Sequence, residues 1–400
     1  MKRKICVITG TRAEFGLLRL LMQGVHDSLD CELQIVATGM HLSTEHGLTF
    51  KEIEQAGFKI DYKVDMQLSS DSATSITKSI GIGTIGFAEA YASLQPDLIV
   101  VLGDRFELIP AVTAALIACI PVAHLHGGET TEGAFDEAIR HSITKMSHLH
   151  FVAAPEYARR VVQLGEHPER VFLVGGLGVD AIKQIKLLTR EQLEESLDFK
   201  FGKKSLLVTF HPVTLSSKSS TLEMAALLEA LDQLRDTHLI FTMPNADTGG
   251  QELAAMIKEF VLERPHTRVF ESLGHVRYLS CMQFVDGVVG NSSSGLAEAP
   301  SMGIGTVNIG DRQKGRLSTD SVIHCASDVE SIHNALEQLY DPAFKILLSN
   351  AVNPYGSGGA SNKIAEIIKN YPLDGLLKKS FFDLPAAVTH PYIIEHPDQL

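Results

Sequence analysis

Short apolar runs alternate with longer amphipathic segments along most of this chain, and the alternation comes in two successive sets. In the first set the apolar runs are residues 5–9, 33–38, 98–102, 122–125, 149–153 and 171–174. The amphipathic segments between them are residues 15–28, 72–94, 107–119, 136–146 and 156–164. Strands that alternate with helices at this spacing form right-handed βαβ units, so the first set predicts a mostly parallel sheet.

The second set begins after the polar stretch 188–204. Its strand-like runs are residues 206–210, 239–242, 269–271, 285–289 and 306–309, and its helix-like segments are residues 221–235, 250–262, 276–282 and 360–371. We therefore expect an α/β protein with two doubly wound Rossmann-like domains, at residues 1–176 and 177–371, followed by a C-terminal extension at 372–400. Folds of this kind bind ligands at the carboxyl ends of their parallel strands.

Charge and composition argue against several classes of protein. The formal net charge of −13 speaks against nucleic acid or an anionic membrane as the main partner. The five cysteines have no C-x-x-C spacing, which favours buried thiols in a reducing compartment. The apolar run near the start is too short for a signal peptide, and no stretch is long enough to span a bilayer. We expect a soluble cytoplasmic protein.

A run of small residues in the second half has the pattern of a phosphate site. Gly290-Asn291-Ser292-Ser293-Ser294-Gly295 follows an apolar strand and precedes a helical segment. Backbone N–H groups at such a turn can hold a phosphate, and Glu298, one turn later, could accept hydrogen bonds from ribose hydroxyls. The basic loop that contains Arg312 and Arg316 follows the next strand. A plain helix cap is the competing interpretation.

Candidate chemical groups in the first half also follow strands. Arg12 comes after the first strand, and Asp104 and Arg105 follow the apolar run 98–102. A helix-capping role is the alternative for Asp104. His124 and His126 share one face of a strand, but no cysteine ligands lie nearby, so a polar lining for a sugar is favoured over a zinc site. We predict no metal.

Further polar residues lie at predicted strand ends and helix starts. Asp136 begins a helix in which Arg140, one turn later, could be its partner. His211 ends the first strand of the second half, and Asn245 and Asp247 follow the next one. Carboxylates and histidines beside a diphosphate site suit acid/base chemistry on a sugar whose leaving group is a nucleotide. Neither a G-x-G-x-x-G fingerprint nor a P-loop is present, and we predict no cofactor.

Nine ordered blocks carry a resemblance to a known family. They are G-T-R-A-E at 10, A-T-G-M-H at 37, L-G-D-R at 102, H-G-G-E at 126, D-E-A-I-R-H-S-I-T-K-M at 136, F-H-P at 210, N-A-D-T-G at 245, G-N-S-S-S-G at 290 and G-D-R-Q-K-G-R at 310. The chain closely resembles hydrolysing UDP-N-acetylglucosamine 2-epimerases of bacterial sialic acid synthesis, the NeuC type, to about residue 371.

The resemblance implies two Rossmann-like domains in the glycosyltransferase-B arrangement. It also implies conversion of UDP-GlcNAc and water to N-acetylmannosamine and UDP, by anti elimination to a 2-acetamidoglucal and then hydration. By this similarity Asp104 and Asp136 match the catalytic carboxylates. The candidate catalytic residues are Asp104, Asp136, His126, Glu129 and His211. The candidate UDP-binding residues are Arg12, Arg105, Asn245, Asp247, Asn291, Ser292, Ser293, Ser294, Gly295, Glu298, Arg312 and Arg316.

The resemblance leaves three questions open. Many relatives have a glutamate where this chain has His126, so the third acid/base group is either His126 or Glu129. The substrate could instead be a UDP-linked 2,4-diacetamido-trideoxyhexose of legionaminic acid synthesis, or the enzyme could be a non-hydrolysing 2-epimerase. A binding protein without catalysis is a further alternative. The family resemblance also implies a homo-oligomer, either a dimer or a tetramer.

Overall fold

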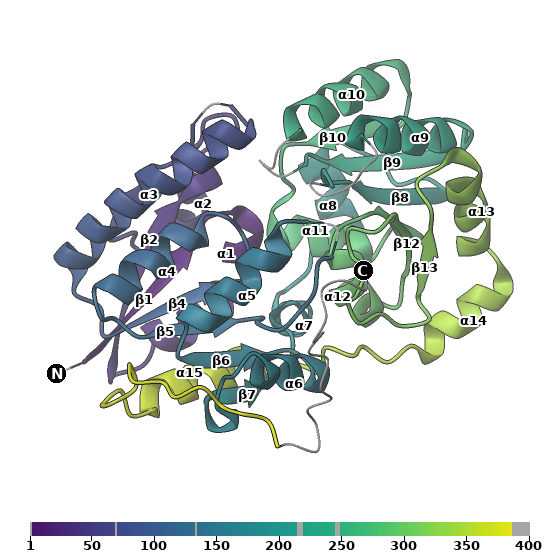
Figure 1. Ribbon diagram of the computed structural model, residues 1–400. Coiled ribbons are helices and arrows are strands. Elements are labelled where there is room, and N and C mark those ends of the chain that lie inside the picture. The colour runs from purple at the N-terminus through teal and green to yellow at the C-terminus, as the bar shows by residue number, and fades with distance from the viewer. Residues whose placement is uncertain (1, 69, 133, 214–218, 245–248, 386–400) are drawn as a thin grey trace, which may run out of the picture.

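The computed structural model describes residues 2–68, 70–132, 134–213, 219–244 and 249–385, which form two parallel sheets flanked by helices (Figure 1). The first sheet has the strand order β3-β2-β1-β4-β5-β6-β7. Its strands are β1 (Arg3–Thr9), β2 (Cys31–Thr38), β3 (Tyr62–Val64), β4 (Leu98–Leu102), β5 (Val122–Leu125), β6 (Leu149–Val152) and β7 (Val171–Leu173). Their neighbours pair in parallel throughout.

The second sheet repeats this topology, with the order β10-β9-β8-β11-β12-β13. Its strands are β8 (Lys204–Thr209), β9 (Thr237–Thr242), β10 (Thr267–Phe270), β11 (Gly287–Gly290), β12 (Gly305–Ile309) and β13 (Val322–Cys325). Two of the thirteen strands in the described part of the chain, β3 and β13, were not predicted from the sequence, and both lie at a sheet edge. β3 has only three residues, and edge strands lack the long apolar run that marks a strand buried on both faces.

Helices cover both faces of each sheet, which explains the continuous apolar strands. Around the first sheet lie α1 (Arg12–His26), α2 (Phe50–Gln55), α3 (Ala73–Leu94), α4 (Leu108–Ile117), α5 (Asp136–Met146) and α6 (Pro155–Gln163), followed by α7 (Leu177–Gln184). Around the second lie α8 (Arg190–Leu197), α9 (Ser220–Asp232), α10 (Gly250–Glu263), α11 (Gly274–Met282), α12 (Ser294–Ala297), α13 (Val329–Leu339) and α14 (Pro342–Asn350). Each sheet has a separate apolar cluster on each of its two faces.

The strand order reverses at one point in each sheet, between β1 and β4 and between β8 and β11. The connections leave in opposite directions at such a point, so a crevice opens at the carboxyl ends of the strands. Arg12 and Asp104 follow β1 and β4, and His211 and Asn291 follow β8 and β11. The topology therefore delivers the predicted site residues to the two crevices.

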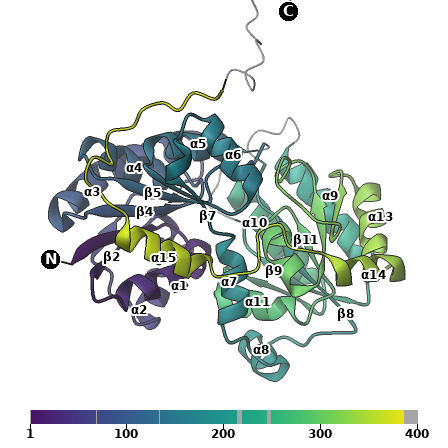
Figure 2. The ribbon, with the colours of Figure 1, turned by 90° about the horizontal axis from the view of Figure 1, so that it is seen from below.

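The last helix, α15 (Ala360–Asn370), returns to the first sheet and lies beside α1 (Figure 2). Ile364 and Ile368 are buried in the same cluster as the core residues of α1. The carboxylate of Asp180, in α7, accepts hydrogen bonds from the first backbone N–H groups of α15. The sequence analysis grouped this helix with the second domain, because an amphipathic pattern does not reveal which sheet a helix covers. The proposed domain limits themselves stay a prediction.

Residues after α15 continue across the first sheet. Arg170 donates hydrogen bonds to the carbonyls of Leu376 and Lys378, at 3.0 and 3.1 Å. The Lys379 ammonium lies 2.9 Å from both oxygens of Glu166, whose side chain is buried. This part of the predicted C-terminal extension is thus bound to the first domain. The prediction for residues 386–400 falls outside the described part of the chain.

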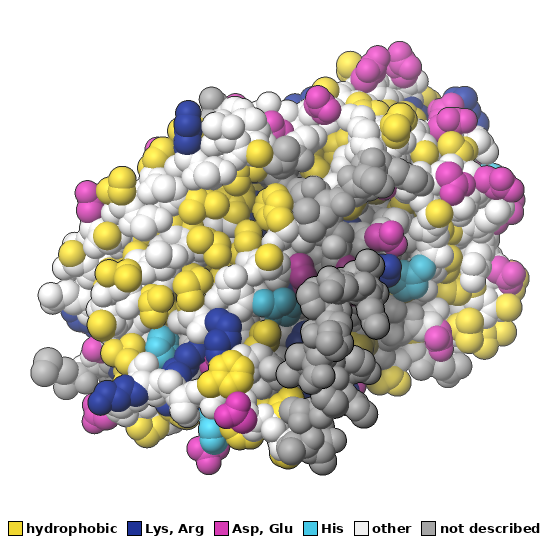
Figure 3. Space-filling model, in the orientation of Figure 1, with side chains coloured by type: hydrophobic (Ala, Val, Ile, Leu, Met, Phe, Trp, Pro, Cys, Tyr) yellow, Lys and Arg dark blue, Asp and Glu magenta, His cyan; other side chains and the backbone are white. Residues whose placement is uncertain are grey.

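Helices α3 and α4 present an apolar outer surface. Figure 3 shows hydrophobic side chains gathered over this region, and the exposed ones include Ile82, Ile85, Leu116 and Ile117. Helix α4 contains no charged residue. Solvent-facing helices normally carry charged or polar residues on their outer face. The surface is compatible with the predicted homo-oligomer, whose existence and order stay a prediction.

We predict that Glu166→Gln destabilises the protein in a pH-dependent way. Burial opposes ionisation of Glu166, but hydrogen bonds from His150, Lys145 and Lys379 outweigh it and hold its pKa at about 2, below the usual 4.5. A depressed carboxyl pKa contributes stability that is present above about pH 4.5 and is lost as the pH falls to about 2. The variant should lose about 2 kcal/mol at pH 7.

Urea denaturation between pH 7 and pH 2 checks this prediction, because the difference between parent and variant should shrink across that acid window. The matched control is Glu156→Gln, since the Glu156 side chain is 44% exposed and forms a surface ion pair with Arg159. That control should lie within about 0.5 kcal/mol of the parent at every pH. A difference for Glu166→Gln that stays constant down to pH 2 would contradict the expectation.

Candidate functional site

A cleft of about 1110 Å³, partly open to solvent, lies between the carboxyl ends of the two sheets. Arg12 and Met40 contribute to its wall from the first half of the chain, and His211, Tyr278 and Ser293 from the second half. Side chains from both halves of the chain line the cleft, so a ligand bound there would contact both halves.

The wall of the cleft in the second half is built around Asn291, which is fully buried. Its side-chain oxygen accepts a hydrogen bond from the backbone N–H of His211 at 2.7 Å, and its amide donates to the His211 carbonyl at 2.8 Å. The Asn291 carbonyl in turn accepts from Gln313 at 2.8 Å and Arg312 at 3.3 Å. Through its side chain and its backbone carbonyl, Asn291 thus joins the ends of β8 and β11 to the loop after β12.

His211, whose backbone is held by Asn291, lines the cleft. Burial lowers its pKa well below the usual value, and the nearby Arg312 and Arg105 lower it further. A neutral imidazole can donate one hydrogen bond and accept another without adding charge. His211 is therefore suited to contacting a ligand phosphate or sugar as a neutral group.

The serine-rich turn forms a shorter helix than its sequence suggests. Helix α12 has only four residues, with Ser293 at its N-cap, and a 3₁₀ helix (Ala299–Met302) follows. Such a short helix contributes little dipole, so arginines must supply most of the positive charge for a phosphate. Burial raises the pKa of Glu298, which follows the turn, to about 7.

Arg12 crosses from the first half of the chain to the second. It begins α1, whose N-terminus has a capping box formed by Thr11 and Glu14. Its guanidinium donates to the Ser272 carbonyl at 2.8 Å and pairs with Glu52. Because Arg12 also lines the cleft, it places a positive charge where a diphosphate would lie.

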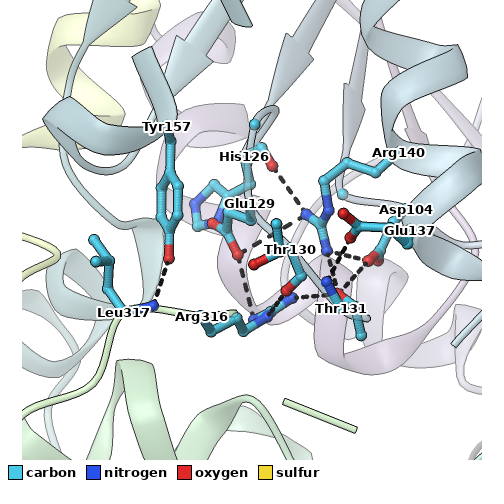
Figure 4. Close-up of polar contacts among 12 residues, drawn as sticks. Asp104, His126, Glu129, Thr130, Thr131, Glu137, Arg140, Tyr157, Arg316 and Leu317 are labelled. Atoms are coloured by element: carbon cyan, nitrogen blue, oxygen red, sulfur yellow. Dashed lines mark hydrogen bonds and ion pairs between the residues drawn. The ribbon is translucent and has the colours of Figure 1, made fainter. Parts of the chain in front are cut away.

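A second polar cluster lies beside the cleft, on the loops after β4 and β5 (Figure 4). Its centre is Arg140 of α5, whose guanidinium pairs with the carboxylate of Asp104. The same guanidinium donates to the His126 carbonyl at 2.9 Å and to the Thr131 hydroxyl at 3.2 Å. Asp136 is buried one turn earlier on α5. Arg140 therefore holds Asp104 near the N-terminal turn of α5, where Asp136 lies.

The buried carboxylate of Glu129 receives contacts from both halves of the chain. Nδ1 of His126 lies 2.8 Å from one oxygen, and Nη1 of Arg316 lies 3.3 Å from the other. Burial alone would raise the pKa of Glu129, but Arg316, His126 and Arg140 together hold it far below its usual range. Arg316, predicted to bind UDP, thus contacts the first half of the chain directly in this structure.

Two other predicted residues have partners outside the cluster. Arg105 forms a buried ion pair with Glu107, with Nη2 and Oε1 3.0 Å apart. His124 is fully buried between the Gly103 carbonyl and the Thr144 hydroxyl, and burial lowers its pKa to about 3. Within the described residues there is no group of three or more His, Cys, Asp or Glu side chains that could hold a metal ion.

The structure brings the predicted residues together in two neighbouring groups. Those that line the cleft are Arg12, His211, Ser292, Ser293, Ser294 and Glu298. Those in the polar cluster are Asp104, His126, Glu129 and Arg316. Thr131, which no motif distinguishes, was not predicted from the sequence. Arg140 pairs with Asp104, and the expected partnership of Arg140 with Asp136 stays a prediction. Asn245 and Asp247 lie outside the described part of the chain.

Comparisons with known sequences agree on one family. A sequence profile described as UDP-N-acetylglucosamine 2-epimerase matches residues 23–369. The GDP/UDP-N,N'-diacetylbacillosamine 2-epimerase (hydrolyzing) of Campylobacter jejuni is 44% identical over 96% of this chain and 100% of its own length. The polysialic acid biosynthesis protein P7 of Escherichia coli is 37% identical over 97% of this chain and 99% of its own length. The UDP-N,N'-diacetylbacillosamine 2-epimerase (hydrolyzing) of Legionella pneumophila is also 37% identical, over 93% and 97%.

Solved structures match the fold over nearly the whole chain. The UDP co-structure of MnaA from S. aureus superposes with a TM-score of 0.77 and 19% identity, covering 96% of this chain and 100% of that one. The UDP-GlcNAc 2-epimerase of Neisseria meningitidis bound to UDP-GlcNAc superposes with a TM-score of 0.77 and 18% sequence identity. The match covers 91% of this chain and 99% of that one. Two parallel-sheet α/β domains in a glycosyltransferase-B-like arrangement are thereby confirmed. No helix among the described residues is long and apolar enough to cross a membrane.

We predict that Asn291→Ala destabilises the protein by about 2–4 kcal/mol, because two buried hydrogen bonds are lost and the His211 backbone groups are left without partners. Urea denaturation at pH 7 measures the change. The control is Asn334→Ala, which removes an exposed asparagine from α13 and should leave stability unchanged or slightly raised. A loss below about 1 kcal/mol for Asn291→Ala would show that this side chain does not hold the cleft wall together.

Proposed function

The chain belongs to the UDP-N-acetylglucosamine 2-epimerase family, and we propose that it is a hydrolysing 2-epimerase that converts a UDP-linked 2-acetamido sugar and water to UDP and the free 2-epimer. The observation that supports this most directly is the pairing of two sites. A cleft with Arg12 and His211 on its walls lies beside a cluster that contains Asp104. The first suits a nucleoside diphosphate, and the second suits proton transfer on its sugar.

Two substrates compete within this proposal. UDP-GlcNAc is the substrate that the motif resemblance implies, and its product would be N-acetylmannosamine for sialic acid synthesis. UDP-N,N'-diacetylbacillosamine, a 2,4-diacetamido-trideoxyhexose, is supported by the names of two relatives that are 44% and 37% identical. We propose the second as the preferred substrate, because the more similar of these relatives is named for a GDP- or UDP-linked form of this sugar and aligns with this chain along its full length.

The proposed mechanism begins with an elimination. A base takes the proton from C2, and the electron pair of the C2–H bond forms the C1–C2 double bond. The C1–O bond breaks at the same time, and the electron pair of that bond leaves with UDP. Negative charge grows on the departing diphosphate, where Arg12 and Arg312 can bind it more tightly as the reaction proceeds. A carboxylate near the sugar also stabilises the positive charge that develops at C1. We assign these carboxylate roles to Asp104 and Asp136.

Hydration completes the reaction. Water adds its oxygen to C1, and a proton returns to C2 from the face opposite to that from which the first was lost, which inverts C2. Two acid/base groups on opposite faces of the sugar can serve the two steps. Arg140 orients the Asp104 carboxylate, and Asp136 lies one helical turn away from Arg140.

We predict that Asp104→Asn and Asp136→Asn each lower turnover by on the order of a hundredfold or more, the usual scale for an acid/base group. UDP affinity, measured by calorimetry, should stay nearly intact because neither residue lines the cleft. Asp236→Asn is the control, since Asp236 is exposed and far from the strand ends that form the site. A variant at either position that turned over like the parent would remove that residue from the mechanism.

The isotope pattern of the product tests the proposal as a whole. Purified protein is incubated with UDP-N,N'-diacetylbacillosamine and, separately, with UDP-GlcNAc, and UDP release is followed. In D₂O the free sugar should carry deuterium at C2, because the lost proton exchanges with solvent. In ¹⁸O-water the label should enter the anomeric hydroxyl and not UDP. Label in UDP would instead mean attack at phosphorus, and no release of UDP from either compound would refute the proposed function.

A further inference from the structure

The loop that follows β12 reaches both polar groups of the site. Arg312, near its start, donates a hydrogen bond to the carbonyl of Asn291 in the cleft wall. Arg316, four residues later, has a buried guanidinium that contacts the first half of the chain. Its Nε donates to the Thr130 carbonyl at 3.1 Å, and its Nη1 lies 3.3 Å from Glu129. A single loop thus connects the cleft to the polar cluster.

Thr131 links Arg316 to the ion pair between Arg140 and Asp104. Its hydroxyl lies 3.5 Å from Nη2 of Arg316 and 3.2 Å from Nη2 of Arg140. Arg140 then pairs with the carboxylate of Asp104. In Figure 4 these side chains lie in an unbroken row from Arg316 to Asp104. A displacement of Arg316 would therefore alter the contacts that fix the proposed catalytic carboxylate.

His126 connects Glu129 to the segment between the two sheets. Its Nε2 accepts the backbone N–H of Leu177, at 3.3 Å, and Leu177 begins α7. A ring nitrogen that accepts an N–H carries no proton, so a proton on the ring is carried by Nδ1, which lies 2.8 Å from an oxygen of Glu129. Both ring nitrogens are thus occupied by partners within the protein.

We propose that Arg316, Glu129 and His126 form an interdomain clamp, which holds the two halves of the chain together and thereby sets the position of Asp104. In this arrangement they are positioning residues and not proton carriers. Glu129 has His126 beside one oxygen and Arg316 beside the other, which makes it a poor base, and both ring nitrogens of His126 lie against groups of the protein. The effect on turnover rests on the proposed function, whereas the clamp itself does not.

A double-mutant cycle tests the clamp without any chemistry. Arg316→Gln, Glu129→Gln and the double variant are compared with the parent by urea denaturation. Each single change removes one member of the Arg316–Glu129 pair and leaves the charge of the other member behind. The free energy of unfolding of the double variant should therefore be at least as high as that of the less stable single variant. We expect a coupling of at least about tenfold in the unfolding equilibrium constant. Additive effects would mean that the two residues do not act as a pair, and would overturn the proposal.

Lys314→Gln is the matched control for Arg316. Lys314 lies in the same loop, its side chain is 62% exposed, and its ammonium is 4.0 Å from Glu132. Removing this charge should change neither stability nor turnover appreciably. With active enzyme, Arg316→Gln should lower kcat about tenfold or more while the calorimetric Kd for UDP stays within about threefold. A weakened UDP affinity with unchanged kcat would instead make Arg316 a ligand of UDP and overturn its positioning role.

Substitutions of His126 separate a positioning role from a proton-transfer role. Its backbone is left-handed, with φ of +62°, a region that asparagine tolerates better than most residues. The amide of His126→Asn can still donate to Glu129, whereas His126→Ala has no donor. We expect His126→Asn to retain kcat within about fivefold and His126→Ala to lose at least tenfold. Equal losses in both variants, with a changed pH profile of kcat, would identify His126 as a proton carrier.

The two proposals can fail independently. If the parent released no UDP from either sugar nucleotide, the proposed function would be wrong, and the stability cycle would still decide whether Arg316 and Glu129 are coupled. If the parent is active but the cycle is additive, the epimerase proposal stands and the clamp does not.

Discussion

A buried guanidinium, that of Arg140, determines how the polar residues of the first sheet are arranged. Its side chain is 1% exposed, so its charge must be balanced within the protein. Asp104 provides that balance, and the His126 carbonyl and Thr131 hydroxyl satisfy further N–H groups. Because Arg140 lies on α5 and its partners lie on the loops after β4 and β5, the requirement for charge balance fixes three separate chain segments relative to one another.

The same principle extends across the junction of the two sheets. Arg316 is buried against Glu129, so separating the two halves would expose or isolate both charges. Helix α15 adds a second connection, since it packs against α1 although it follows the second sheet in sequence. Asp180, in the segment between the sheets, binds the N-terminus of that helix. The two halves are therefore joined at two separate places.

Sequence reasoning predicted what depends on local pattern and missed what depends on distant contacts. The central strands β4 and β5 were predicted to the residue, because both faces of each are buried and the apolar run is continuous. Positions of Asp104 and His211 followed from the rule that parallel strands end at the crevice. The pairing of Asp104 with Arg140 joins residues 36 apart, and that of Glu129 with Arg316 joins residues farther apart still. Nothing local distinguishes a guanidinium that will bind phosphate from one that will bind a carboxylate.

Charge balance in the polar cluster also bears on how an acidic protein could bind the anionic substrate of the proposed function. The chain carries a net charge of −13, and a UDP-sugar is itself an anion. Carboxylates beside the reacting sugar would repel it if they were uncompensated. Here Asp104 is paired with Arg140 and Glu129 with Arg316, so the cluster adds little net negative charge next to the cleft. Under the proposed function, Arg12, which also pairs with Glu52, then meets little opposition from the polar cluster when it stabilises the charge that develops as UDP departs.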